Sequence, residues 1–334
     1  MAGPVLVTGG SGFVGGALLE RLLAAGLEVR ALARTEEAAR AVAARGATPV
    51  RGDVLDLPSL VEAMRGCEVV YHAAGVNAMC VRDPRPMDRV NIEGSGNVVR
   101  AAVATGVRRL VHTSSAAAIG EAPGTVGRED SPHRGWYLSR YERSKHLAER
   151  RVLEWSARLG VDVVCVNPSS VQGPGRVRGS ARLLLDLVNG RLPILVDTHV
   201  SIVDVRDCAE GHVLACERGG TGERYLLNGF TISTREAVSL LRRLTGEPRR
   251  VRFVPRWTAR AAGEVFEAAG RLTRRELPLC REAVRTLLHG HRYDGSRAER
   301  EPGLRYTPME ETVRRALAWY ADRGLAPPLL EGRD

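Results

Sequence analysis

Lysine is almost absent from this 334-residue chain, and long apolar runs are absent altogether. No stretch approaches the ~18 consecutive apolar residues that would span a bilayer. The strand-like run 5–7 lies close to the first residue, and no signal-type segment precedes it. We therefore expect a soluble, cytoplasmic protein without a membrane span.

Cysteine is sparse and scattered, and no pair has the C-x-x-C spacing of a zinc or redox site. Three of the six cysteines lie in apolar runs, where a free thiol behaves as a small hydrophobic side chain. Cytoplasmic thiols also stay reduced. The sequence therefore predicts no metal site and six free thiols, at Cys67, Cys80, Cys165, Cys208, Cys216 and Cys280.

Positive charge is plentiful, with a formal net charge of +10, but it is not gathered into a basic stripe or tail. Arginines are spread along the chain, often beside a glutamate, as in Glu142-Arg143 and Glu149-Arg150. Aromatic residues make up only 4% of the chain, and there is no zinc finger. Nucleic acid is therefore not an expected partner, although the general field would attract anionic substrates.

Of the 49 basic residues, 48 are arginine and one is Lys145. Such a composition uses arginine wherever any cation suffices. Lysine differs from arginine in geometry and pKa, so Lys145 marks a position where arginine would not do. Lys145 becomes a functional candidate only if it also falls in a motif for independent reasons.

Short apolar strands alternate with helices through the first half of the chain. This order predicts βαβ units, and hence an α/β fold with a doubly wound parallel sheet of the Rossmann type. Strands are expected at 5–8, 28–33, 49–52, 68–72, 109–113 and 162–167. Helices are expected at 17–25, up to about 45, 57–65, 87–105 and 138–159.

From about Gly173 the pattern loosens, because glycine and proline divide the chain into short pieces. Helices are expected at 234–244, 259–271, 282–288 and 310–320. We predict a dinucleotide-binding domain at 1–172, to which a segment at about 194–230 returns. A smaller mixed α/β substrate lobe would occupy 173–325.

A glycine-rich turn joins the first strand to the first helix. Its glycines at positions 9, 12 and 15 follow the spacing G-x-x-G-x-x-G, a variant of the dinucleotide fingerprint. They allow a tight turn, close backbone approach to a pyrophosphate and close helix–strand contact, while the helix N-terminus attracts the diphosphate. The expected contacts are Thr8, Gly9, Ser11, Gly12, Phe13, Val14 and Gly15.

The second strand ends in Ala33-Arg34, and no acidic residue lies between Val29 and Thr35. An enzyme that prefers NAD usually has a carboxylate here for the ribose 2′-hydroxyl, whereas arginine would meet the 2′-phosphate of NADP. This favours NADP(H), with Asp53 and Val54 after the third strand near the adenine. The alternatives are a solvated arginine at a helix entry and a turn aspartate.

Tyr141 and Lys145 form a Y-x-x-x-K pair on one face of the helix predicted at 138–159. Carbonyl reduction needs a proton donor, and tyrosine, with a pKa near 10, needs a cation to stabilise its phenolate. A lysine can do this while it also holds the ribose hydroxyls. Ser115, after the fifth strand, would bind the substrate carbonyl, and Tyr137 is a weaker candidate than Tyr141.

These features together resemble the extended short-chain dehydrogenase/reductase superfamily, and within it the dihydroflavonol-reductase-like group and bacterial hopanoid-associated sugar epimerases. The likeness extends to about residue 320. It rests on segments 5–15, 29–34, 52–53, 72–74, 90–97, 112–115, 141–145, 167–175, 203–212, 222–229 and 231–246.

The resemblance implies that Ser115, Tyr141 and Lys145 form the catalytic triad. It implies that Ala73 and Ala74 line the cofactor and that Pro168 and Ser169 border the nicotinamide amide. Asn91 would support the lysine through backbone or water contacts. Such enzymes commonly dimerise through the helices predicted at 87–105 and 138–159, but nothing in the sequence decides this.

The superfamily includes reductases, epimerases and dehydratases, so the fold does not select a reaction. Nucleotide-sugar enzymes usually place an arginine near the start of the stretch 199–207, where this chain has small and apolar residues at 200–202. His199, Arg176 and Arg178 lie nearby. Sugar dehydratases also need acidic residues after the catalytic Ser or Thr, where this chain has three alanines at 116–118.

We therefore predict an NADPH-dependent reductase of a ketone or aldehyde on a lipophilic, aromatic or secondary-metabolite-type substrate, because an apolar wall suits such a ligand. The alternatives are an NAD(P)-dependent sugar epimerase or dehydratase and a non-catalytic NADP-binding regulator. The alanines could equally serve only to pack the turn. His133, Trp136 and Tyr137 are further candidates for the lining of the substrate pocket.

Overall fold

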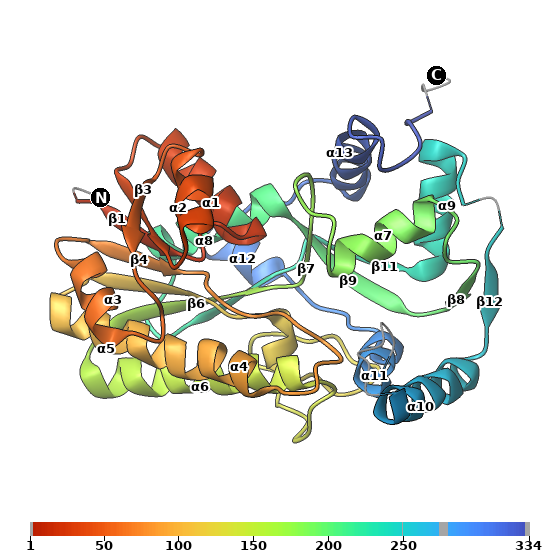
Figure 1. Cartoon of the computed structure of the whole chain (residues 1–334), viewed down its shortest axis with the longest axis horizontal. Helices are drawn as coiled ribbons and strands as arrows, with labels where there is room; N and C mark the ends of the chain where they lie inside the picture. Colours follow the sequence, from red (N-terminus) through yellow and green to blue (C-terminus); the bar gives the residue numbers. More distant parts are fainter. Residues whose placement is uncertain (1–2, 249, 274–279, 331–334) are drawn as a thin grey trace.

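A seven-stranded parallel sheet is the centre of the larger of two lobes (Figure 1). The computed structural model describes residues 3–248, 250–273 and 280–330. The strand order of the sheet is β10-β6-β5-β4-β1-β2-β3. The strands are β1 (Val5–Thr8), β2 (Val29–Ala33), β3 (Thr48–Arg51), β4 (Val69–His72), β5 (Arg109–Thr113), β6 (Asp162–Pro168) and β10 (Arg224–Leu227). The doubly wound fold predicted from the sequence is confirmed.

Helices cover both faces of this sheet because successive strand residues point to opposite sides. Val5 and Val7 pack with α1 (Phe13–Ala24), α2 (Glu36–Ala43) and α8 (Val205–Arg218). Leu6, between those two valines, faces the other layer. That layer consists of α3 (Leu57–Met64), α5 (Ser95–Thr105) and α6 (Arg140–Leu159).

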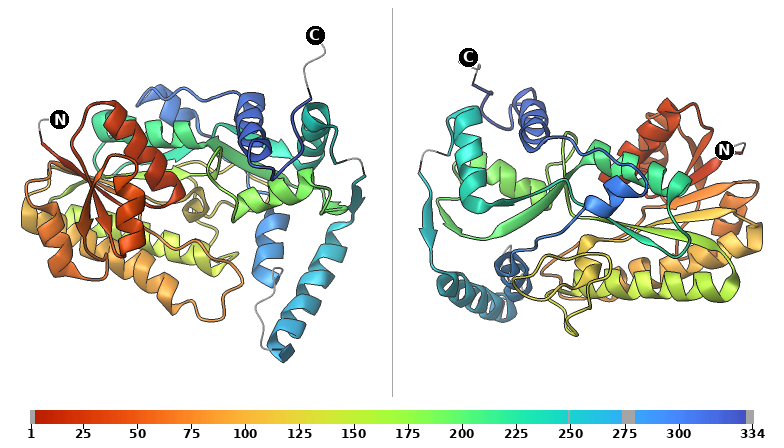
Figure 2. Two further views of the ribbon diagram at one scale, coloured as in Figure 1. Left: turned by 45° about the horizontal axis from the view of Figure 1, so that its top comes forward. Right: turned by 180° about the vertical axis from the view of Figure 1, so that it is seen from behind.

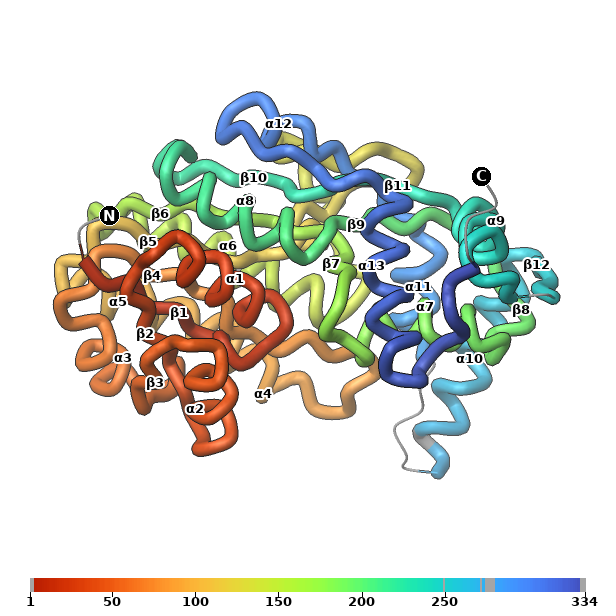
Figure 3. Tube along the Cα trace, turned by 90° about the horizontal axis from the view of Figure 1, so that it is seen from above, coloured from red at the N-terminus to blue at the C-terminus, as the bar shows by residue number. Residues whose placement is uncertain are grey.

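The smaller lobe lies beside the carboxyl ends of the central strands (Figure 3). It contains a mixed three-stranded sheet in the order β11-β9-β7 and a two-stranded sheet of β8 and β12. The strands are β7 (Ser170–Gln172), β8 (Ile194–Val196), β9 (His199–Asp204), β11 (Phe230–Ser233) and β12 (Arg252–Val254). The helices are α7 (Ser180–Val188), α9 (Thr234–Thr245), α10 (Arg256–Thr273), α11 (Arg281–His289) and α13 (Met309–Ala321), whereas α12 (Ser296–Arg300) packs against β10 of the larger sheet.

The chain returns to the larger sheet after entering this lobe. Helix α8 packs on the sheet, and β10 extends it at the edge of β6. The sequence pattern did not predict α8 as a helix, because Gly211 interrupts it. A Cβ at Gly211 would lie 2.6 Å from a methyl carbon of Leu227, so glycine allows α8 to approach β10 closely.

The helix predicted at 87–105 is continuous but not regular. It consists of α4 (Arg85–Asp88), a π-helical segment at Arg89–Gly94, and α5. The periodicity of apolar residues cannot reveal the π segment, because it shifts the register for only a few residues. Among the described residues, no helix has the length and apolar content needed to cross a membrane.

The prediction of six free thiols is wrong for two of the cysteines. Cys80 and Cys280 form a disulfide, at a sequence separation of 200. Cys80 lies in the loop after β4, and Cys280 is the N-cap of α11. Spacing along the chain cannot reveal such a pair, because only the tertiary fold brings the two loops together. The other four cysteines are buried free thiols.

Replacing both bridged cysteines by serine should destabilise the protein under oxidising conditions. Closing a loop of this length lowers the entropy of the unfolded chain, and the chain-entropy estimate of that effect is about 5 kcal/mol at most. Urea unfolding of wild type and of the Cys80→Ser/Cys280→Ser variant measures the difference. In reductant the two proteins should become similar. Equal midpoints without reductant, together with six titratable thiols in denatured wild type, would contradict the bridge.

Candidate active site

The glycine turn after β1 forms a cradle whose shape depends on missing side chains. Gly9 has a positive φ of 75°, and a Cβ there would lie 2.6 Å from the Ala74 nitrogen. A Cβ on Gly15 would clash with the Gly9 carbonyl group. The N-cap of α1 is Gly12, which offers no capping side chain, and the first turn carries no acidic residue. Backbone N–H groups at this helix end are therefore available to an anion.

A chain of buried hydrogen bonds connects the end of β1, at the start of this cradle, to β4 and α5. The Thr8 hydroxyl lies 2.7 Å from His72 Nδ1, and His72 Nε2 lies 3.0 Å from the Ser95 hydroxyl. Thr8 also receives hydrogen bonds from the nitrogens of Ala73 and Ala74, through its carbonyl and hydroxyl oxygens respectively. Burial lowers the pKa of His72 to about 3, with the charge of Lys145 contributing, so this histidine is neutral.

Arg34 and Asp53 come together beyond the ends of β2 and β3. The Arg34 guanidinium lies 3.9 Å from the Asp53 carboxylate, and 69% of the arginine side chain is exposed. Asp53 also accepts a hydrogen bond from the Leu55 nitrogen, which fixes the carboxylate. Val54, which follows Asp53 in the chain, is buried, and its carbonyl accepts a hydrogen bond from Asn97. An exposed cation therefore stands beside the cradle, with a carboxylate near it.

Ser115 and Tyr141 meet at the carboxyl edge of the sheet. Ser115 follows β5 and caps a short 3₁₀ helix at Ala116–Ile119, while Tyr141 lies in the first turn of α6. The Ser115 hydroxyl lies close enough to Tyr141 to act on the pKa of its phenol. Burial raises the pKa of Tyr141, which the Ser115 hydroxyl and the charge of Arg176 only partly offset. The phenol is therefore protonated at neutral pH and can donate a proton.

Lys145 lies one turn after Tyr141 on the same face of α6. Its Nζ donates a hydrogen bond of 2.8 Å to the Thr113 carbonyl oxygen. Burial lowers the pKa of Lys145 to about 8, although the nearby Glu149 carboxylate favours the charged form. Glu149 in turn accepts hydrogen bonds from Asn167 and Arg224.

Asn91 lies in the π-helical segment and does not contact Lys145 directly. Its side chain exchanges two hydrogen bonds with the backbone of Val76 and donates a third, of 2.8 Å, to Ser144. The loop at Gly75 separates it from the lysine, since a Cβ on Gly75 would lie 3.3 Å from Asn91 Oδ1 and 3.9 Å from Lys145 Nζ. Asn91 therefore fixes the loop that borders Lys145.

Pro168 ends β6, and Ser169 follows it at the junction of the two lobes. The Ser169 nitrogen donates to the Leu227 carbonyl, whereas its buried hydroxyl has no described partner. A buried hydroxyl without a partner is unfavourable unless a ligand supplies one. The open cradle at Gly9–Gly15 and this hydroxyl both fit a bound dinucleotide.

The sequence assigned no role to His72 or Glu149, and it marked Arg176 only as a cation near the stretch 199–207. Arg176 lies over the Phe13 ring, at 5.4 Å from its centroid, and its charge acts on Tyr141. His72 and Glu149 are the buried partners of Thr8 and of Asn167. Glu149 had a signal, because it follows Tyr141 and Lys145 at a spacing of four on one helix face. The contact of Arg176 had none, because it joins loops far apart in sequence.

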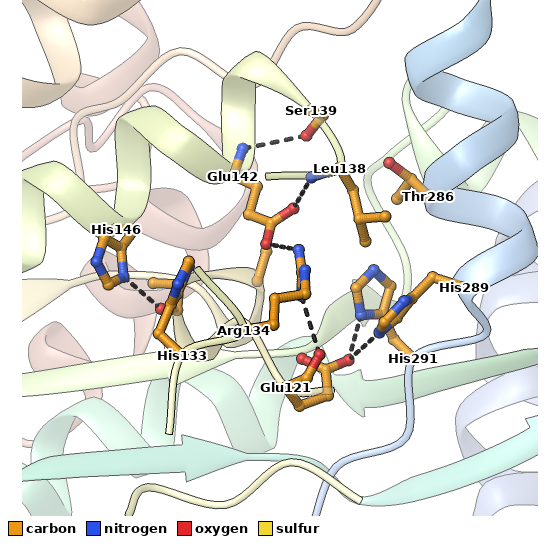
Figure 4. Close-up of polar contacts among 12 residues, drawn as sticks. Glu121, His133, Arg134, Leu138, Ser139, Glu142, His146, Thr286, His289 and His291 are labelled. Atoms are coloured by element: carbon orange, nitrogen blue, oxygen red, sulfur yellow. Dashed lines mark hydrogen bonds and ion pairs between the residues drawn. The ribbon is translucent and has the colours of Figure 1, made fainter. Parts of the chain in front are cut away.

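The loop after Ser115 carries a second polar cluster (Figure 4). Glu121 accepts hydrogen bonds from His289 at 3.1 Å and from His291 at 2.6 Å. Burial alone would raise the pKa of Glu121, but these two hydrogen bonds hold it at about 2. Arg134 is paired with Glu142 on α6 and donates to the Glu121 carbonyl. This cluster joins the loop to the smaller lobe.

The chain is similar to known proteins both in sequence and in fold. Residues 5–227 match the profile of the NAD dependent epimerase/dehydratase family. A protein from Synechocystis sp. named as dihydroflavonol 4-reductase-like is 32% identical over 97% of this chain and 96% of its own length. The sterol demethylase protein B of Methylococcus capsulatus is 34% identical over 96% of this chain and 99% of its own. The crystal structure of gox2253 superposes with a TM-score of 0.85 at 30% identity, covering 96% of this chain and 99% of that one.

The buried amine of Lys145 predicts a specific pH dependence of stability. Below about pH 8 the amine is charged in both states, so the folded protein carries the full burial cost. As the pH rises from about 8 towards the ordinary value of 10.5, the folded state loses its proton first and this cost is released. The total is on the order of 3 kcal/mol.

Wild type should therefore gain stability relative to Lys145→Met between pH 7 and pH 10. Urea unfolding of both proteins across this range measures the change in their difference. Leu147→Met on the same helix is the control, because its difference from wild type should not vary with pH. A constant difference for Lys145→Met would show that the lysine has an ordinary pKa.

Proposed function

The chain belongs to the NAD dependent epimerase/dehydratase family, and within it we propose that the protein is an NADPH-dependent reductase. Its substrate would be a ketone or aldehyde on a lipophilic or aromatic molecule. The observation that carries the proposal is the protonated Tyr141 hydroxyl, which lies beside Ser115 and one helical turn before the buried Lys145. The names of the two relatives, a flavonoid-type reductase and a sterol-processing protein, support a carbonyl on a lipophilic skeleton.

Each residue of the triad has a distinct task in this proposal. Ser115 holds the substrate oxygen, and Tyr141 delivers its proton to that oxygen as the carbonyl is reduced. The Lys145 ammonium then stabilises the phenolate that remains, because opposite charges at close range favour the ionised form. Bound NADPH would supply the hydride. Its pyrophosphate would lie on the glycine cradle, with Ala73, Ala74, Pro168 and Ser169 towards its nicotinamide end.

The segment after Ser115 supports a reductase over a dehydratase. Ala116 and Ala118 are buried and pack the turn, and Ala117 between them is the residue left partly open. None of the three can serve as the acid or base that sugar dehydration needs. Tyr141, Ser115 and Lys145 suffice for a single reduction.

The division of labour between the lobes follows from the same proposal. Residues 1–172 would bind the dinucleotide, with the segment at about 194–230 contributing α8 and β10 to that domain. Residues 173–325 would mainly select the substrate. The packing of α8 and β10 on the central sheet supports this division.

A sugar epimerase remains the second candidate, and one observation favours it. Arg176 is partly buried between Phe13 and Tyr141, where a cation could meet an anionic substrate group. An epimerase oxidises and re-reduces one carbon, so it retains its cofactor. Purified protein that carries tightly bound NAD would place the epimerase first. Reversible binding of NADPH favours the reductase.

Tyr141→Phe should nearly abolish turnover and leave NADPH affinity within a few-fold of wild type. The variant loses the proton donor but keeps the ring, and the cradle residues are untouched. Stopped-flow or steady-state NADPH oxidation with a panel of ketones and aldehydes measures turnover, and fluorescence titration measures affinity. Turnover equal to that of wild type would rule out Tyr141 as the acid.

Arg34→Asp should shift cofactor preference towards NADH. The substitution removes the cation proposed to bind the 2′-phosphate and adds a carboxylate that repels it. Fluorescence titration with NADPH and NADH gives the affinity ratio for wild type and variant. Arg40→Asp, the same charge change on the exposed side of α2, is the control. An unchanged ratio in Arg34→Asp means that Arg34 does not read the phosphate.

A further inference from the structure

A cavity of about 630 Å³ lies in the smaller lobe, between helices α10 and α11 and the loop that leads into α6. These two helices pair and project from the rest of the lobe (Figure 2). The wall combines side chains from four separate parts of the chain. The lining residues lie within 123–138, 198–199, 256–264 and 281–292, and they include Arg256, Arg260, Arg281, Arg285 and Arg292.

Positive charge dominates the polar part of this wall. Five arginines line the cavity, and Glu264, which is paired with Arg281 at 2.7 Å, is the one carboxylate among the described lining residues. Glu264 neutralises one of the five positive charges, so the lining keeps a net charge of four arginines. Guanidinium groups with no carboxylate partner bind anions well, because they offer several N–H donors in a fixed plane.

Three of the five arginines cross-link the walls of the cavity and are held in place by these contacts. Arg256 donates to the carbonyl of Leu288 near the end of α11, and Arg292 donates to that of Gly124. Arg285 Nη2 donates to the Leu138 carbonyl at 2.9 Å. Each uses one described hydrogen bond of the five that a guanidinium can donate. Arg260, on α10, has no partner among the described residues.

Apolar side chains form another part of the wall. Trp136 and Leu138 come from the loop before α6, and Val284 and Leu288 come from the inner face of α11. Val284 and Leu288 are almost fully buried around the cavity floor. A ligand that fills this space therefore needs an apolar body as well as an anionic group.

The cavity also adjoins the catalytic helix. Leu138 lies three residues before Tyr141, and Glu142 on that helix accepts a hydrogen bond from the Leu138 nitrogen. On the opposite side, His289 of the cavity wall is bound to Glu121, in the segment that follows Ser115 (Figure 4). The cavity and the triad thus share the segments that hold Ser115 and Tyr141.

We propose that this cavity binds the anionic end of an amphiphilic substrate, a lipophilic oxo acid, whose carbonyl reaches Ser115 and Tyr141. The inference rests on the proposed reductase function and narrows its substrate class from any lipophilic carbonyl compound to an anionic one. The arginines select the charge, and the apolar side chains accept the hydrocarbon body.

The first test measures binding alone, in the Tyr141→Phe variant with NADPH present. Isothermal titration compares dodecanoate with dodecanol, which has the same chain length and no charge, and with UDP. Dodecanoate should bind clearly more tightly than dodecanol. Arg260→Glu should weaken dodecanoate binding about tenfold or more, since one charge-assisted contact is replaced by repulsion. Arg158→Glu on α6, also an exposed arginine without a described partner, should leave it unchanged.

The second test separates a substrate from an effector of the same chemistry. Wild type and Arg260→Glu are compared on 12-oxododecanoate and its methyl ester, and the acid should have the lower KM only in wild type. Equal KM values for acid and ester, with binding that still depends on Arg260, would assign the cavity to a separate effector and overturn the proposal.

Two further outcomes separate a failure of the reductase function from a failure of the proposed site for lipophilic acids. If neither aldehyde is reduced while dodecanoate binding still depends on Arg260, the reductase function fails, and with it the substrate assignment, but the anion site stands. If dodecanol binds as tightly as dodecanoate, or if only UDP binds, the cavity is not a site for lipophilic acids, whatever the reaction.

Discussion

The site depends on one costly placement, the ammonium group of Lys145 beneath the carboxyl edge of the sheet. Burial opposes the charge, and the surroundings compensate it with the Thr113 carbonyl and the Glu149 carboxylate. Two histidines nearby, His72 and His112, are kept neutral by burial and by the same ammonium charge. The arrangement explains why a chain rich in arginine retains lysine here. A planar guanidinium differs from an ammonium in shape and in the directions of its N–H groups, so arginine would not reproduce these contacts.

Local patterns predicted the larger domain closely. The strand at 109–113 and the glycine turn are where the sequence placed them, because both follow from short-range rules of periodicity and turn geometry. The same rules placed Tyr141 and Lys145 on one helix face, and the structure brings Ser115 beside Tyr141. Helix α6 begins at Arg140 rather than at 138, because Ser139 is its capping residue.

The rest depends on contacts between distant segments. The contact of Arg176 with Phe13 and that of Glu121 with His291 each join loops that no periodic pattern relates. The arginine-lined cavity also combines residues from such loops. The spacing of cysteines along the chain also led to a wrong prediction. The cysteines at 80 and 280 have the spacing of unrelated thiols, and only the packing of α11 against the loop after β4 pairs them. Function in such a fold is therefore decided by loop geometry, while the sheet supplies the frame.

The bond between Cys80 and Cys280 changes the connectivity of the molecule as well as its stability. The covalent structure is a closed ring that runs from 80 to 280, with a tail of 79 residues before it and one of 54 residues after it. The ring encloses Ser115, Tyr141, Lys145 and Arg176, whereas the glycine cradle lies on the first tail. A single cut in any loop between 80 and 280 would open the ring without separating the fragments. A nicked molecule would thus stay in one piece and keep its two lobes joined until the sulfur–sulfur bond is reduced.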